Sequence, residues 1–207
     1  MNKILWHIFY TIDTPYENEA IRLSKELESR EIDFFLFGTP NTHDWMSNCL
    51  GRVMTLNKTS SAGPIGLLDA DMYCFGPAND LKFAPEGVDI LTHIRPKMPE
   101  HSKYCSGITA FLTPNSRKVL QRWADYCESD NQKDEKLREQ LYLKHSIDMF
   151  LQLKPPIVLR DIGEHYNYVN DQHLSLEQME LKGIQVCHGG IDGPASRRYL
   201  SMIGGRR

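Results

Sequence analysis

The first forty residues run from an apolar segment through an amphipathic helical pattern to a second apolar segment. Residues 4–10 and 34–37 are rich in β-branched and aromatic side chains, which is typical of buried strands. Between them, Thr14 and Pro15 suit a helix N-cap and first helical position, and Glu17 suits a capping box. A strand, a helix and a strand in this order predict a parallel βαβ unit, and therefore an α/β fold.

Later segments predict more strands and a second capped helix. Thr113 and Pro114 repeat the N-cap device, whereas the charged run 128–139 is expected to form a loop and a solvated helix face. Trp45 and Trp123 are expected in the core. The other expected strands cover residues 52–56, 64–68, 88–92, 108–112 and 184–188. A chain of 207 residues with these elements suits a single domain, residues 1–207.

Composition and charge exclude several classes of function. The net charge of -3 provides no basic field for nucleic acid, so no nucleic-acid partner is expected. The five cysteines are widely spread without a CxxC pair, which favours reduced thiols over a disulfide framework or a zinc ribbon. The N-terminal apolar run is too short for a signal peptide or a membrane span, so a cytoplasmic protein without a membrane span is expected.

Two carboxylates follow the apolar run 64–68, in the segment Asp69-Ala70-Asp71. Because side chains alternate along a strand, Asp69 and Asp71 are expected on one side and Ala70 on the other. Ligands of open α/β sheets bind at the carboxyl ends of strands, and carboxylate oxygens suit Mg²⁺ or Mn²⁺. The alternative interpretation, a strand that ends in a solvated acidic turn, stays open for an Asp-x-Asp segment taken alone.

The segment GLLDADMYCFGP resembles the Asp-x-Asp motif of GT-A-fold glycosyltransferases, which use nucleotide-diphospho-sugar donors. YTIDTPYENEAIRLSKEL is similar to the opening strand, loop and helix of that family, and YCSGITAF to its Ser-Gly segment. Residues 44–52 are similar to a Trp-Asn-Lys stretch in which Arg52 replaces the usual lysine. VCHGG resembles the strand-end histidine segment of glycogenin-like members.

This resemblance implies a Rossmann-like GT-A domain with a mixed, mainly parallel central sheet flanked by helices. Residues 1–112 would bind the nucleotide sugar, and residues 113–207 would form the acceptor side. The implied ligands of Mn²⁺ or Mg²⁺ are Asp69, Asp71 and His188. The implied catalytic residues are Asp71, Arg95 and Asp148. The implied nucleotide-sugar-binding residues are Thr11, Asp13, Thr14, Arg52, Asp69, Ala70, Arg95, Ser106, Gly107, Gly189, Gly190 and Arg197.

The implied activity is metal-dependent transfer of a hexosyl group from a nucleotide-diphosphate sugar, with a UDP-sugar favoured. The histidine-containing pattern resembles that of retaining members, whereas an inverting enzyme would need a carboxylate base such as Asp148 or Asp161. A glycan, a lipid-linked sugar, a protein and a small molecule all remain open as acceptors.

Two other functions are weighed against sugar transfer. The first is a catalytically inactive module that binds sugar nucleotides, which the sequence does not distinguish from an active enzyme. The second is an Asp-x-Asp phosphoryl-transfer enzyme. Its motif is commonly followed by Thr or Val and supported by a downstream Gly-Asp motif, whereas Met72-Tyr73 follows here.

Overall fold

The computed structural model describes residues 2–42, 44–59, 61–130, 138–169 and 174–188. Its central sheet has six strands in the order β2-β1-β3-β6-β5-β7. The strand β1 pairs in parallel with β2 and β3, and β7 pairs in parallel with β5, whereas β6 runs antiparallel to β3 and β5. The strands are β1 (Leu5–Thr11), β2 (Phe34–Thr39), β3 (Ile65–Asp69), β5 (Ile90–Ile94), β6 (Tyr104–Phe111) and β7 (Leu159–Asp161). The expected mixed, mainly parallel sheet is confirmed.

A second, three-stranded sheet has the order β4-β9-β8. It consists of β4 (Met72–Cys74), β8 (Tyr168–Val169) and β9 (Val186–His188). The strand β4 follows β3 after a two-residue turn, and it pairs antiparallel with β9 so that Met72 lies opposite His188. This pairing brings the last described strand of the chain to the end of β3.

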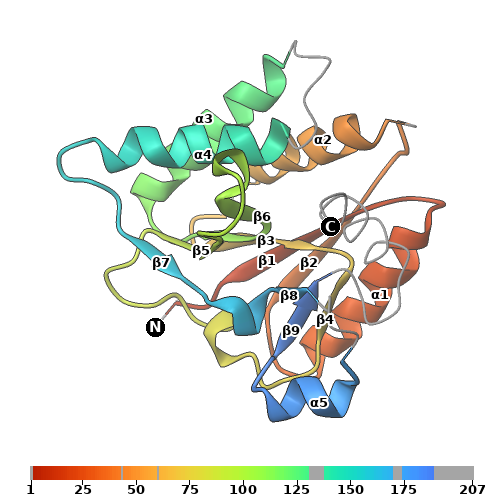
Figure 1. Ribbon diagram of the computed structural model, residues 1–207. Helices are drawn as coiled ribbons and strands as arrows, with labels where there is room; N and C mark the ends of the chain where they lie inside the picture. Colours follow the sequence, from red (N-terminus) through yellow and green to blue (C-terminus); the bar gives the residue numbers. More distant parts are fainter. Residues whose placement is uncertain (1, 43, 60, 131–137, 170–173, 189–207) are drawn as a thin grey trace.

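Helices cover both faces of the central sheet (Figure 1). The helix α1 (Pro15–Glu28) packs on one face, over the buried side chains of Trp6 and Ile8. The opposite face is covered by α2 (Trp45–Asn57), α3 (Pro114–Glu128) and α4 (Arg138–Leu151). The shorter helices are η1 (Asn79–Leu81), η2 (Glu100–Ser102), η3 (Glu164–Tyr166) and α5 (Leu176–Leu181). The result is a three-layer α/β arrangement with one apolar layer on each side of the sheet.

The strand expected at residues 52–56 is wrong, because these residues belong to α2. Asp44 caps this helix by accepting from the Ser47 amide, and Leu50, Val53 and Leu56 are buried at helical spacing. Tertiary packing of this apolar stripe outweighs the strand preference of the β-branched residues. Trp45, expected in the core, is 45% exposed at the start of the same helix.

Other local predictions have mixed outcomes. Thr14 caps α1 as expected, but the Glu17 carboxylate accepts from the amide of Asp13 and not from that of Thr14. Trp123 is fully buried and the five cysteines are free thiols, as predicted. The run 128–139 was expected to be solvated at its helical end, yet Glu139 is buried in α4. No helix among the described residues is both long enough and apolar enough to cross a membrane.

Candidate functional site

Asp69, Asp71 and His188 converge at the carboxyl end of β3. The His188 Nε2 lies 3.2 Å from Asp69 Oδ2 and 3.5 Å from Asp71 Oδ1. Each residue can offer one ligand atom such that all three atoms lie within 4.8 Å of one another. Asp69 ends β3, Asp71 lies in the turn before β4, and the β4–β9 pairing supplies His188. The expected grouping of these three side chains is therefore present.

The electrostatics of this group favour a cation. Burial raises the pKa of Asp71 and the charge of Asp69 adds to this, although His188 opposes it. Burial alone would also raise the pKa of Asp69, but Arg52 and His188 bring it below its ordinary value. Burial would lower the pKa of His188, whereas Asp71 and Asp69 raise it well above the ordinary range. Two repelling carboxylates and one imidazole nitrogen form a donor set that fits Mn²⁺ or Mg²⁺.

Gly107 of β6 lies directly against this group. A Cβ atom at this position would approach Asp69 Cγ to 2.8 Å and His188 Cε1 to 2.9 Å, which is closer than van der Waals contact allows. The absence of a side chain is therefore what lets Asp69 and His188 lie over the β6 backbone. Ala70 points the other way, into the apolar layer under α1. The expected alternation of Asp69, Ala70 and Asp71 is thus seen in the burial of the segment.

Arg52 links Asp69 to a second carboxylate, Glu139. The Arg52 guanidinium forms an ion pair with Asp69 Oδ1, and its Nη2 lies 2.8 Å from Glu139 Oε1. The Ser106 hydroxyl donates to Glu139 Oε2 at 3.3 Å. Burial raises the pKa of Glu139, and the Arg52 charge opposes this. Arg52, expected to contact the donor, thus holds Asp69 in place, and Ser106 faces the same network.

Glu139 is a residue that sequence reasoning missed. It lies at the end of a charged run, which is the usual composition of a solvated helix face. In the structure only 5% of its side chain is exposed, because α4 packs against α3 and β6. A buried acid in a helix requires a cationic partner. The partner of Glu139 is Arg52, which is far away in the sequence, so no local pattern could have revealed the pair.

Arg95 follows β5 and turns toward β6 and α4. Its Nη2 donates to the Tyr104 carbonyl at 3.3 Å and to the Gln140 side chain. Burial raises the pKa of the neighbouring Cys105 thiol, but the charges of Arg95 and His188 bring it below its ordinary value. The Arg95 guanidinium therefore acts electrostatically on Cys105, which itself contacts His188.

Asp148 and Asp161 have other partners. Tyr104 donates to Asp148 Oδ1 at 3.2 Å, and Lys144 forms an ion pair with the same carboxylate. Positions 139 and 148 are nine residues apart on α4, which corresponds to about 13 Å of helix rise. Asp161 accepts from the amide of Ile94 and from its own loop, at the β7 side of the sheet. A catalytic role for Asp148 stays a prediction. The contacts that the structure shows for Asp148 are those with Tyr104 and Lys144.

The loop after β1 lies at the same edge of the sheet as Asp69. The two parallel strands β1 and β3 pair Phe9 with Asp69, so residues 11–14 continue past the end of β3. The Thr14 hydroxyl donates to the Thr11 carbonyl at 2.6 Å, and Asp13 adopts a positive φ of 59° with its side chain exposed. Binding of a nucleotide by this loop stays a prediction. The predicted residues Gly189, Gly190 and Arg197 lie outside the described part of the chain.

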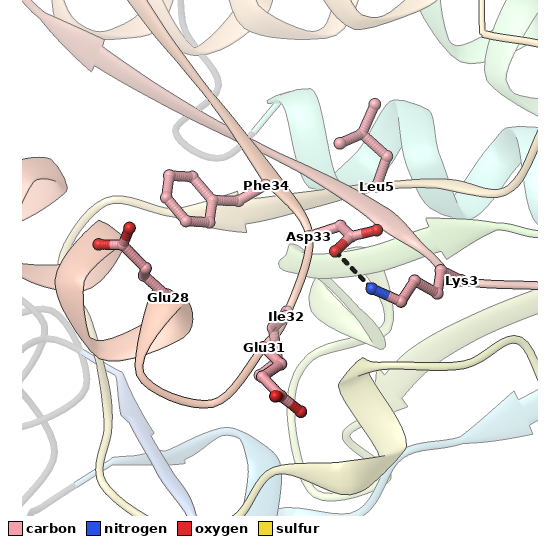
Figure 2. A pocket seen from close by; sticks show the side chains of 7 residues that line it. All are labelled: Lys3, Leu5, Glu28, Glu31, Ile32, Asp33 and Phe34. Atoms are coloured by element: carbon pink, nitrogen blue, oxygen red, sulfur yellow. Dashed lines mark hydrogen bonds and ion pairs between the residues drawn. The ribbon is translucent and has the colours of Figure 1, made fainter.

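A hollow at the opposite edge of the sheet is separate from this site (Figure 2). It lies at the amino ends of β1 and β2, where Lys3 forms an ion pair with Asp33 at 2.9 Å. Glu28 and Glu31 also line it. None of the residues that line it belongs to the groups described above. Asp33 is therefore an aspartate remote from Asp71, at the other end of the strands.

Comparison with known proteins supports the fold. No family model and no curated protein sequence matches the chain. A glycosyltransferase involved in the glycosylation of the major capsid of PBCV-1 matches with a TM-score of 0.62 and 12% identity, over 96% of this chain and 98% of the other. The galactosyltransferase LgtC, solved with donor and acceptor sugar analogs, matches with a TM-score of 0.55 and 9% identity, over 97% and 95% of the two chains.

A third match is the glycosyltransferase GlyE of Streptococcus pneumoniae TIGR4, with a TM-score of 0.58 and 12% identity. The chain aligns over 91% of its own length but spans only 54% of the GlyE structure. At these identities the likeness concerns the fold. The chain therefore has the GT-A-like fold of nucleotide-sugar glycosyltransferases.

The variant Gly107→Ala should weaken Mn²⁺ binding about 10-fold or more, because the new methyl group must displace Asp69 or His188. The fold should survive, since both displaced groups are side-chain ends. Isothermal calorimetry measures the affinity and thermal melting measures the fold. Gly51→Ala is the matched control, because its Cβ enters open space on α2. Equal Mn²⁺ affinity in the two variants would remove Gly107 from the site.

The variant Arg52→Met should lower the free energy of unfolding by about 3 kcal/mol, since it leaves the buried Glu139 without its counter-charge. Adding Glu139→Gln in that background should recover more than half of the loss. Urea denaturation in chelating buffer measures both changes. An unfolding curve of Arg52→Met that superimposes on the wild-type curve would show that the pair contributes nothing in solution.

Proposed function

We propose that this chain is a metal-dependent glycosyltransferase that moves a hexosyl group from a nucleotide-diphosphate sugar, with a UDP-sugar favoured, to an acceptor. The observation that carries the proposal is the convergence of Asp69, Asp71 and His188 at the carboxyl end of a strand in a GT-A-like fold. This edge is where open α/β sheets bind ligands. The three structures compared above are glycosyltransferases, which favours sugar transfer over phosphoryl transfer.

The chemistry to be supported is the departure of a nucleoside diphosphate. Cleavage of the sugar–phosphate bond places negative charge on the leaving oxygen, and Mn²⁺ or Mg²⁺ bound by Asp69, Asp71 and His188 would stabilise that charge. Arg95 is the proposed second source of positive charge. Arg52 acts on the first ligand, because its ion pair holds Asp69 Oδ1 and leaves Oδ2 directed toward His188.

We assign the remaining contacts with the nucleotide-sugar donor from where residues lie in the fold or in the sequence. Thr11 and Asp13 are proposed to receive the base and ribose, since their loop lies at the same edge as Asp69. Gly107 lets Asp69 and His188 lie over the β6 backbone, and the donor sugar is placed beside Ser106 and Gly107 in this proposal. Gly189, Gly190 and Arg197 follow His188 in the sequence and are proposed to contact the diphosphate.

A retaining reaction fits the carboxylates better than an inverting one. Inversion needs a carboxylate base free to take the acceptor proton. Asp148 is paired with Lys144 and hydrogen-bonded to Tyr104, and Asp161 accepts from backbone amides on the β7 side. With both acids engaged in this way, retention of configuration is the outcome that we propose.

The variant Asp71→Asn should reduce turnover of a nucleotide sugar by about 100-fold or more, because it removes the charge of one metal ligand. The melting temperature in chelating buffer should stay close to the wild-type value or rise, since the pKa of Asp71 shows that its charge is disfavoured by burial and by Asp69. A panel of UDP- and other nucleotide-diphosphate sugars with Mn²⁺, scored by the nucleoside diphosphate released, measures the turnover.

Asp33→Asn is the matched control, because Asp33 lies at the opposite edge of the sheet and pairs only with Lys3 among the described residues (Figure 2). It should leave turnover unchanged. An Asp71→Asn protein that keeps most of its activity would refute the metal role. Mn²⁺-dependent binding of a nucleotide sugar by wild-type protein, without turnover of any donor, would instead identify an inactive sugar-nucleotide-binding module.

A further inference from the structure

Asn167 contacts the metal-ligand histidine from the side away from the two aspartates. Its Oδ1 lies 3.0 Å from His188 Nδ1, whereas His188 Nε2 faces Asp69 and Asp71. Asn167 itself is buried, with 5% of its surface exposed. Nδ1 therefore faces an amide oxygen and Nε2 faces the two carboxylates, and the Cys105 thiol also contacts the ring.

Asn167 is held in one position by its surroundings. Its backbone amide donates to the Glu164 carbonyl at 3.2 Å, and the next residue begins β8, which pairs in parallel with β9 so that Val169 lies opposite His188. On its other side, the Asn167 Nδ2 donates to Cys105 Sγ at 3.3 Å. In this arrangement the NH₂ group is directed at the sulfur and the amide oxygen at the imidazole.

An amide oxygen can only accept a hydrogen bond, so His188 Nδ1 must carry a proton. In a neutral imidazole the other nitrogen then has the free electron pair. The opposite tautomer would place an N–H on Nε2 and direct it at the aspartates, where it would compete with a metal ion. In the neutral ring, the Asn167 contact therefore keeps the proton on Nδ1 and leaves the electron pair of Nε2 available to a metal ion.

We propose that Asn167 is a positioning residue that fixes the tautomer and the ring orientation of His188, so that Nε2 is available to a divalent metal ion. The inference rests on the metal site of the proposed function, and it adds a residue that acts on the metal only through His188. Partners of this kind orient metal-bound histidines in many proteins, and their loss commonly weakens metal affinity by about 10- to 100-fold.

The test compares two substitutions of similar size by calorimetric titration with Mn²⁺ alone at one fixed pH. Asn167→Leu removes the acceptor and should weaken Mn²⁺ binding by about 10-fold or more. Asn167→Asp keeps an acceptor oxygen toward Nδ1 and should bind Mn²⁺ within about threefold of wild type, or more tightly. Thermal melting reports the fold of each variant. Equal affinity for Mn²⁺ in Asn167→Leu and wild type would overturn the proposal.

A double-mutant cycle separates positioning from general packing. In the His188→Ala background, Asn167→Leu should cause no further loss of Mn²⁺ affinity, because its effect passes through the missing ring. Additive losses would overturn the proposal. If Asn167→Leu does not fold, the ¹⁵N shifts of the His188 ring in Mg²⁺-loaded wild-type protein decide the question: a protonated Nδ1 is expected, and a protonated Nε2 would contradict it.

Failure of this inference differs from failure of the proposed function. Mn²⁺ binding that depends on His188 and Asn167, without turnover of any nucleotide sugar, would refute the transferase and leave the role of Asn167 intact. Turnover of a nucleotide sugar, together with an Mn²⁺ affinity that is unchanged in Asn167→Leu, would support the transferase and refute the role of Asn167. Wild-type protein that binds no Mn²⁺ would refute both.

Discussion

Three carboxylates lie close together at the carboxyl end of β3. The need to compensate their negative charges determines which side chains can surround them. Asp69, Asp71 and Glu139 are largely removed from solvent, where unpaired charges are costly. Arg52 offsets two of them by lying between Asp69 and Glu139. Asp71 is compensated less: burial and Asp69 keep its pKa raised, although the charges of His188 and, more weakly, Arg52 oppose this. The group is therefore short of positive charge on one side, the side on which a divalent cation would sit.

The topology explains how such a group can form from distant parts of the chain. The strand β3 supplies Asp69, a two-residue turn supplies Asp71, and the antiparallel pairing of β4 with β9 brings His188 to the same place. The helices α2 and α4 pack together on one face of the sheet and contribute Arg52 and Glu139. Asp69 and His188 thus belong to strands, and Asp71 lies in the tight turn that joins β3 to β4. The glycine at position 107 then lets Asp69 and His188 approach the neighbouring strand.

Much of this arrangement could be predicted from sequence, and the exceptions have physical causes. Apolar runs with clear boundaries predicted β1, β2 and β3, and the Asp-x-Asp segment marked the end of β3. Residues 52–56 were misassigned because local β-branched residues resemble a strand, whereas the helical spacing of their buried side chains emerges only over the longer segment. Glu139 carried no local signal, since its burial depends on how α4 packs. Asn167 likewise carried no local signal, because its role depends on a contact with His188 of β9, 21 residues later.

The central claim is that Asp69, Asp71 and His188 bind one divalent ion that also binds the donor diphosphate. Pulsed electron paramagnetic resonance of the protein with bound Mn²⁺ and UDP tests it most directly. The account predicts a ¹⁴N coupling from a coordinated imidazole that disappears in His188→Ala, together with ³¹P couplings from the diphosphate on the same ion. A spectrum with neither coupling, as expected of Mn²⁺ surrounded only by water, would contradict it.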